Sequence, residues 1–216
     1  MKKLFLLVSS MLIFIEGYTQ KATFGAEAGI NLAGATVKYP TYDVKDGRPQ
    51  PGLIIGGFAD IPLISKQISF RPSLLYSLER ASEVVEGDKA KINVSFINIP
   101  LDMIYHPKPG QRHLFYGIGP FLAFNLGGKY DWAGTRKQSI AFGSDSSDFG
   151  RSYKRFDLGI DLLAGYQLNK KISISAKFDY GLLNMSHTTE DPEEAKLVKI
   201  HTLCFGITAG YFFNVK

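Results

Sequence analysis

The amino-acid sequence predicts an all-β fold, an eight-stranded antiparallel up-and-down transmembrane β-barrel with short periplasmic turns and long extracellular loops. Three observations lead to this prediction. Apolar and polar residues alternate with a period of two in eight segments, these segments are longer than ordinary strands, and short and long connections alternate between them. A period of two puts successive side chains on opposite faces of a strand, so each segment has one apolar and one polar face.

The first 19 residues have the pattern of a cleaved secretory signal peptide, which leaves residues 20–216 for the barrel domain. Two lysines precede an apolar stretch over residues 4–15, and small residues suit cleavage after Thr19. The apolar stretch is too short for a spanning helix, which needs about 20 residues. We therefore expect export of the mature chain.

Eight candidate strands follow in order. They run over residues 23–33, 51–61, 67–80, 91–106, 114–126, 156–168, 172–182 and 199–213. The sixth is the cleanest, because Phe156, Leu158 and Ile160 begin an apolar face while Arg155 and Asp157 begin a polar one. The fourth changes phase, with apolar residues on even positions up to Phe96 and on odd positions from Ile97. A β-bulge at this point would shift the faces in that way.

The lengths of the segments and of their connections favour a membrane barrel over a soluble sandwich. A tilted spanning strand needs about 9–11 residues, whereas a typical strand has about 5–6. Short connections lie near 62–66, 107–112 and 169–170, and long ones lie near 34–50, 81–90, 128–152 and 184–198. This alternation is expected of an outer-membrane barrel whose chain begins and ends in the periplasm.

The polar faces predict a charged lumen. Its expected members are Glu27, Asp60, Arg71, Glu79, Asp102, Arg155, Asp157, Asp161, Lys177 and Asp179. Side chains just fill a barrel of eight strands, so these groups are expected to form a paired, partly hydrated network rather than to line a wide channel. Asp157 and Asp161 are expected to pair with Arg155, Arg71 or Lys177 across neighbouring strands.

The outward faces predict an aromatic girdle at the periplasmic ends of the strands. Its members are Tyr105, Tyr116, Tyr166 and Tyr211. Tyrosine is enriched at the level of the lipid headgroups, where its ring is buried and its hydroxyl is wet. Ordinary packing between two sheets is the alternative explanation.

Composition and motifs exclude several kinds of function. The formal charge of +5 is spread along the chain, whereas a nucleic-acid partner calls for a clustered basic face. Cys204 is the only cysteine, so a multi-thiolate metal site is excluded. The pair Gly117 and Gly119 lacks the third glycine of a nucleotide-binding loop, and His106 and His113 flank a turn without converging carboxylates. We assign no catalytic, cofactor-binding or metal-binding residues.

Two predicted outer loops carry residues of interest. Ser186, His187 and Asp191 have the residue types of a hydrolase triad, but such a triad needs a base that is oriented by a third group. Trp132, the only tryptophan, lies in the long connection near 128–152, where it is a candidate contact residue or an anchor for the loop on the rim.

Several of these segments together resemble a known family. Residues 96–101 read Phe-Ile-Asn-Ile-Pro-Leu, residues 116–120 read Tyr-Gly-Ile-Gly-Pro, and Phe-Asp-Leu-Gly, Gly-Tyr and Tyr-Gly-Leu begin at Phe156, Gly165 and Tyr180. As a set they resemble the PorT-like outer-membrane β-barrel proteins of Bacteroidetes-type bacteria, over essentially the whole mature chain. The resemblance implies an eight-stranded barrel in the outer membrane. The founding member is associated with type IX secretion, and the shared residues are architectural.

The leading functional hypothesis is a non-enzymatic integral barrel of the outer membrane, either a structural envelope component or an accessory subunit of an outer-membrane complex. Its expected partners are outer-membrane lipid and other outer-membrane or periplasmic proteins. Two alternatives stay open. One is a barrel enzyme that acts on lipid A or peptides, and the other is a soluble periplasmic barrel that binds a ligand as a lipocalin does. An apolar interior and a polar exterior would identify the second.

Overall fold

The structure is a computed structural model of the chain. It describes residues 22–38, 43–46, 48–63, 67–85, 88–107, 113–132, 136–140, 151–188 and 199–213. The expected signal peptide, residues 1–19, lies outside these ranges, so its cleavage stays a prediction.

Within the described ranges, no helix combines the length and the hydropathy that crossing a bilayer requires.

All regular structure in the described residues is β. The strands are β1 (Thr23–Lys38), β2 (Asp43–Asp46), β3 (Arg48–Pro62), β4 (Ile68–Val85), β5 (Asp88–Tyr105), β6 (Leu114–Trp132), β7 (Arg136–Ile140), β8 (Arg151–Tyr153), β9 (Phe156–Gln167), β10 (Ile172–Gly181), β11 (Ser186–Thr188) and β12 (Lys199–Phe212). Eight of them correspond to the eight segments predicted from the period-two pattern.

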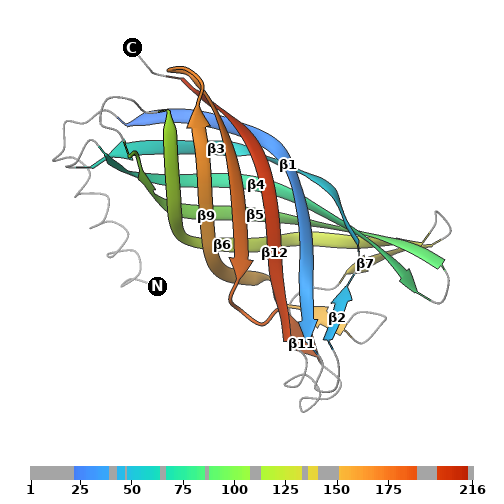
Figure 1. Cartoon of the computed structure of the whole chain (residues 1–216). Coiled ribbons are helices and arrows are strands. Elements are labelled where there is room, and N and C mark those ends of the chain that lie inside the picture. The colour runs from blue at the N-terminus through green and yellow to red at the C-terminus, as the bar shows by residue number, and fades with distance from the viewer. Residues whose placement is uncertain are drawn as a thin grey trace.

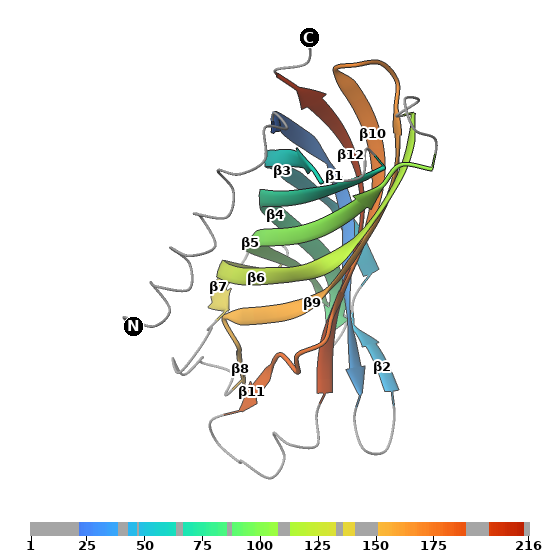
Figure 2. The same ribbon diagram turned by 90° about the vertical axis from the view of Figure 1, so that its left-hand side faces the viewer.

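These eight strands close into a barrel (Figures 1 and 2). Their order is β12, β10, β9, β6, β5, β4, β3 and β1, with every neighbouring pair antiparallel, and β1 then pairs with β12. The closing seam runs from Gly25 opposite Phe212 to Lys38 opposite Lys199. Since each barrel strand has two neighbours, the backbone groups find their partners within the wall. The predicted fold class is confirmed.

The two ends of the barrel differ. At one, here named the short-turn end, three brief connections join β3 to β4, β5 to β6, and β9 to β10. At the other, here named the extended end, β4, β5 and β6 project beyond the barrel, and β2 and β7 add to its wall. Many of the residues that were predicted to form loops near 34–50 and 81–90 therefore belong to strands. Alternation marks only the part of a strand that has one buried face, so these extensions were missed.

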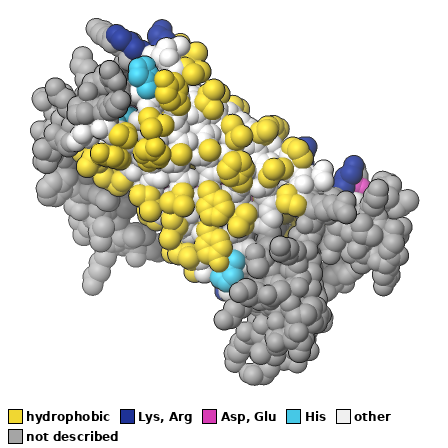
Figure 3. Space-filling model, viewed as in Figure 1, with side chains coloured by type: hydrophobic (Ala, Val, Ile, Leu, Met, Phe, Trp, Pro, Cys, Tyr) yellow, Lys and Arg dark blue, Asp and Glu magenta, His cyan; other side chains and the backbone are white. Residues whose placement is uncertain are grey.

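Side chains alternate between the lumen and the outer surface along the wall. In β9 the odd-numbered residues from Asp157 to Gly165 are buried, and the even-numbered ones are mostly exposed. Exposed large hydrophobic residues occur on all eight barrel strands. They cover the wall seen in Figure 3, whereas lysine and arginine lie towards its ends. This is the reverse of a soluble ligand-binding barrel and the arrangement expected of a barrel in lipid.

One register irregularity lies beside the expected bulge. Between β5 and β6 the pairing shifts between Ser95 and Phe96, which face Gly127 and Asn125, so the extra residue is Leu126 on β6. The expected change of face on β5 was wrong. Phe96 points inward and packs with Phe121 and Ala123 in a buried apolar cluster, because the lumen accepts apolar side chains as well as charged ones.

A glycine on β1 permits the close approach at the closing seam. A Cβ atom on Gly29 would collide with the carbonyl oxygen of Ile207 and lie 2.7 Å from Thr208 Cα, both backbone atoms of β12. A Cβ on Gly34 of the same strand would meet only Pro49 Cγ, at 3.9 Å.

We expect Gly29→Val to destabilise the folded barrel by about 1–3 kcal/mol, the usual cost of overpacking, because the backbone of β12 must move away. Gly34→Val is the matched control and should behave as the parent protein. Urea unfolding in detergent micelles, followed by heat-modifiable gel mobility, measures both variants. Equal midpoints for the two would contradict the proposed role of Gly29 in closure.

Candidate functional site

The charged side chains of the lumen form the candidate site. Of the predicted lumenal groups, Glu27, Asp60, Arg71, Asp102, Asp157, Asp161 and Lys177 are buried, and Asp179 and Glu79 are partly buried. They come from six strands and are brought together only by closure of the barrel. Because water is scarce in such an interior, each charge needs a partner or a hydrated neighbour.

Arg71 organises the short-turn end of the lumen. Its guanidinium group lies 3.6 Å from Asp60 Oδ2, and Ser69 donates a hydrogen bond of 2.5 Å to the other oxygen of this carboxylate. Three phenylalanine rings surround the guanidinium carbon at 5.0–5.7 Å from their centroids, namely Phe58, Phe115 and Phe212. Cation–π attraction and the ion pair together hold the charge.

Apolar side chains pack beside Arg71 at the short-turn end of the lumen. Ile104, Phe115 and Leu163 form a buried cluster with 0–5% exposure, and the ring of Phe58 meets that of Phe212 edge-on at 5.0 Å. With Arg71, these side chains pack together inside the lumen. The described side chains at the short-turn end therefore form a packed plug.

Lys177 forms the central ion pair. Its Nζ donates to Glu27 Oε1 at 2.5 Å, and Thr208 donates to the other oxygen of Glu27 at 3.2 Å. Lys177 is on β10 and Glu27 is on β1, the two neighbours of β12 in the wall, so this contact bridges the inner face of β12, where Thr208 lies. The sequence predicted both residues for the interior but not this pairing.

The acidic groups outnumber the basic ones in the described interior. Asp161 and Asp179 are directly opposite each other on β9 and β10. Asp161 is fully buried, and its carboxyl group hydrogen-bonds that of Asp179, which requires a proton on one of the two; Asp102 Oδ1 has no hydrogen-bond partner among the described residues. Like charges at opposed positions repel each other. Bound protons, water or cations would reduce this repulsion and stabilise this part of the interior.

A small cavity lies in the half of the lumen towards the extended end. Its volume is about 20 Å³, and it is lined by Ser77, Glu79, Phe96, Asn98, Phe121, Ala123, Asp157, Asp179, Thr202 and Cys204. Thr202 donates to Asp157 Oδ2 at 2.6 Å, and the Leu158 backbone N–H donates to Oδ1 at 2.8 Å. Asn98 Nδ2 donates to Asp179 at 3.4 Å.

The lumen prediction needs two corrections. Arg155 is exposed, because it precedes the first residue of β9 and strand alternation does not extend to it. Asp157 consequently takes its hydrogen bonds from Thr202 and a backbone N–H instead of from an arginine. Neutral residues that share the inward phase were missed, among them Asn31, Asn98 and Thr208, although the same period-two count would have found them.

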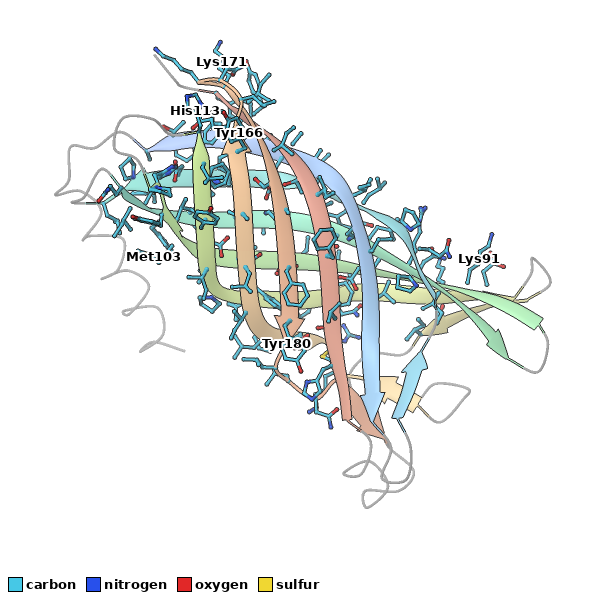
Figure 4. All side chains as sticks on the ribbon, in the orientation of Figure 1. Lys91, Met103, His113, Tyr166, Lys171 and Tyr180 are labelled. Atoms are coloured by element: carbon cyan, nitrogen blue, oxygen red, sulfur yellow. The ribbon has the colours of Figure 1, made fainter. Side chains whose placement is uncertain are left out.

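The four predicted girdle tyrosines lie on the outer surface at the short-turn end. Tyr105, Tyr116, Tyr166 and Tyr211 are 44–48% exposed, and Tyr105 is opposite Tyr116 in the register. The ring of His113 stacks on that of Tyr166 with centroids 5.7 Å apart, and Figure 4 places both near Lys171 at the rim. The arrangement forms a band on one edge of the wall.

The other candidate residues are placed less completely. Ser186 and His187 lie on β11, which pairs with β8, whereas Asp191 lies outside the described residues. Trp132 is the last residue of β6, opposite Ala90 of β5 and Arg136 of β7. Among the described residues, no three His, Cys, Asp or Glu side chains converge as metal ligands.

Comparisons with known proteins give one family match. The family model described as outer membrane protein beta-barrel domain matches residues 18–187. No curated protein sequence matches the chain.

The chain is also similar to solved structures of outer-membrane proteins. Ail of Yersinia pestis shares 12% identity, covers 89% of this chain and 99% of its own, and superposes with a TM-score of 0.46. Neisserial surface protein A shares 14%, with coverage of 90% and 100% and a TM-score of 0.49. Outer membrane protein W of E. coli shares 14%, with coverage of 91% and 100% and a TM-score of 0.41.

We expect Lys177→Met to lower the free energy of unfolding by about 3–5 kcal/mol, because it leaves the Glu27 carboxylate buried without its cation. The double variant Lys177→Met/Glu27→Gln should recover most of this loss. Lys171→Met removes an exposed lysine near the start of β10 and serves as the control, with no change in the urea midpoint. If the double variant were no more stable than Lys177→Met, the pair would not be the coupled unit described here.

Proposed function

The chain belongs to the family of outer membrane protein β-barrel domains, and on that premise we propose that it is a non-enzymatic barrel, acting as a structural envelope component or as an accessory subunit of an outer-membrane complex. The protein lies in the outer membrane. Its short-turn end then faces the periplasm and its extended end faces outward, because barrels of this class have short periplasmic turns.

The observation that carries the proposal is the packed periplasmic half of the lumen. Arg71, its three phenylalanine neighbours and the Ile104 cluster occupy this half, and the Lys177–Glu27 pair bridges β10 and β1 over the inner face of β12. A barrel of eight strands has an interior just wide enough for such side chains. A role in the passage of solutes is therefore disfavoured, and a role that uses the wall and its extensions is favoured.

The outward extensions supply a surface for such a role. β4 and β5 each have 18 residues, whereas a tilted strand needs about 9–11 to cross the hydrocarbon layer. The surplus projects from the extended end with β6 and β7 (Figure 1). The segments that resemble PorT-like proteins support the accessory-subunit form of the proposal, in which the extension or the periplasmic turns meet another protein.

Affinity purification of the tagged full-length protein from a detergent extract tests this function. We expect an accessory subunit to retain a stable partner, identified by mass spectrometry. The matched variant replaces residues 82–91, the outer part of the β4–β5 hairpin, with an Asn-Gly turn, which should leave the barrel folded. Loss of the partner from this variant would place the contact on the extension. Capture of no partner by either protein would reject the accessory-subunit form and leave the structural one.

The enzymatic alternative has a separate test. Ser186→Ala and His187→Ala should leave the lipid A profile of the producing cells unchanged if the barrel is non-enzymatic. A changed profile with either variant, in protein that is still folded, would overturn the proposal.

The tyrosine girdle predicts how deep two outward-facing positions lie in the bilayer. In a Trp132→Phe background, Tyr211→Trp should be quenched most by lipids brominated near the headgroup, and Leu162→Trp most by lipids brominated deep in the chain. Both positions are 44% exposed, so only depth distinguishes them. The reason is that Tyr211 lies at the rim, whereas Leu162 lies midway along β9. Indistinguishable quenching profiles would contradict the girdle.

A further inference from the structure

We propose that the cavity in the outer half of the lumen is a binding site for a primary ammonium group. Residues from six adjacent strands, β4, β5, β6, β9, β10 and β12, line this cavity. The inference rests on its charge, its hydrogen-bonding groups and its size, and it does not depend on the structural or accessory role proposed above.

The charge of the lining is entirely acidic. Glu79, Asp157 and Asp179 contribute carboxyl groups, and the lining residues include no lysine, arginine or histidine. The two buried basic residues of the described lumen are bound elsewhere, Lys177 to Glu27 and Arg71 to Asp60. A cationic occupant would therefore supply a charge that the protein itself does not place in the cavity.

The lining also presents a buried acceptor that lacks a partner. Asn98 is only 9% exposed, and its Nδ2 donates to Asp179 Oδ2, so its Oδ1 is left as an acceptor without a partner. The carboxyl group of Asp179 also hydrogen-bonds that of Asp161, and the hydroxyl of Thr202 already donates to Asp157. Buried acceptors are normally satisfied, so the amide oxygen of Asn98 beside this cavity calls for an occupant that donates.

Size and shape select the kind of donor. A volume of about 20 Å³ is enough to hold a small donor such as water or an ammonium group. The described residues hold no converging set of metal ligands. Phe96 and Phe121 form part of the wall, and aromatic rings attract organic cations. A primary ammonium group with a short alkyl stem meets all of these conditions, whereas water brings donors but no charge.

The position of the cavity indicates the side of entry. Asp157 is the second residue of β9, at the extended end of the barrel, whereas the plug around Arg71 closes the opposite end. We infer that the amine enters from outside the cell. Its stem would lie against the apolar surface of Phe96, Phe121 and Ala123.

Nuclear magnetic resonance of the full-length mature protein in detergent micelles tests the site. The probe is methylammonium, added at constant ionic strength, and the reporter is the side-chain amide of Asn98, assigned from its loss in Asn98→Leu. We expect a saturable shift of this signal with methylammonium and with 1,4-diaminobutane, but not with sodium or tetramethylammonium. No shift, or the same shift with sodium, would overturn the proposal and leave water as the occupant.

A pair of charge-matched variants separates binding from general electrostatics. Asp179→Asn should weaken methylammonium binding at least about tenfold, the effect of losing one charge-assisted hydrogen bond. Asp161→Asn removes the same charge from the facing residue on β9 without removing a lining group, and should weaken binding less than about threefold. Equal weakening in the two variants would contradict a specific site. If Asp179→Asn does not fold, Glu79→Gln replaces it with the same expectation.

Discussion

The hydrogen-bonded seam between β1 and β12 is the constraint on which the structure depends. Inside a bilayer an unpaired backbone N–H or C=O group has no solvent partner, so a sheet with two free edges could not span it. The register from Gly25 opposite Phe212 onwards removes those edges. Gly29 shows how closely the seam is packed, since the carbonyl oxygen of Ile207 occupies the space where a side chain would begin.

Closure with eight strands also determines the chemistry of the interior. The lumen is narrow, so its side chains must pack, and the charged ones must find partners across it. The periplasmic half solves this with Arg71 between three rings, and the centre of the lumen does so with the Lys177–Glu27 pair. The outer half is different, because its carboxyl groups are held by Thr202, Asn98 and the backbone, and the amide oxygen of Asn98 is left without a partner beside a cavity.

The exterior divides into an apolar wall and the strand extensions beyond it. The wall exposes large hydrophobic residues on every barrel strand, with tyrosines at its short-turn edge, which is a surface suited to hydrocarbon and headgroups. Beyond it, β4, β5 and β6 continue as a sheet that no longer needs an apolar outer face. The same strands thus anchor the protein in the membrane and continue beyond it at the extended end.

The sequence by itself determined the strand number, the closed architecture and the faces, because period-two alternation is a local property that each strand carries. It placed Asp157 and Asp161 inside and Tyr166 outside before any register was known. Only the tertiary structure decided which inward groups meet. Lys177 and Glu27 are 150 residues apart, and their contact depends on how β1, β10 and β12 are aligned around the barrel. Arg155, Phe96 and the strand extensions departed from the prediction for a related reason: a strand's ends and bulges are set by its neighbours, and a pattern within one segment does not contain them.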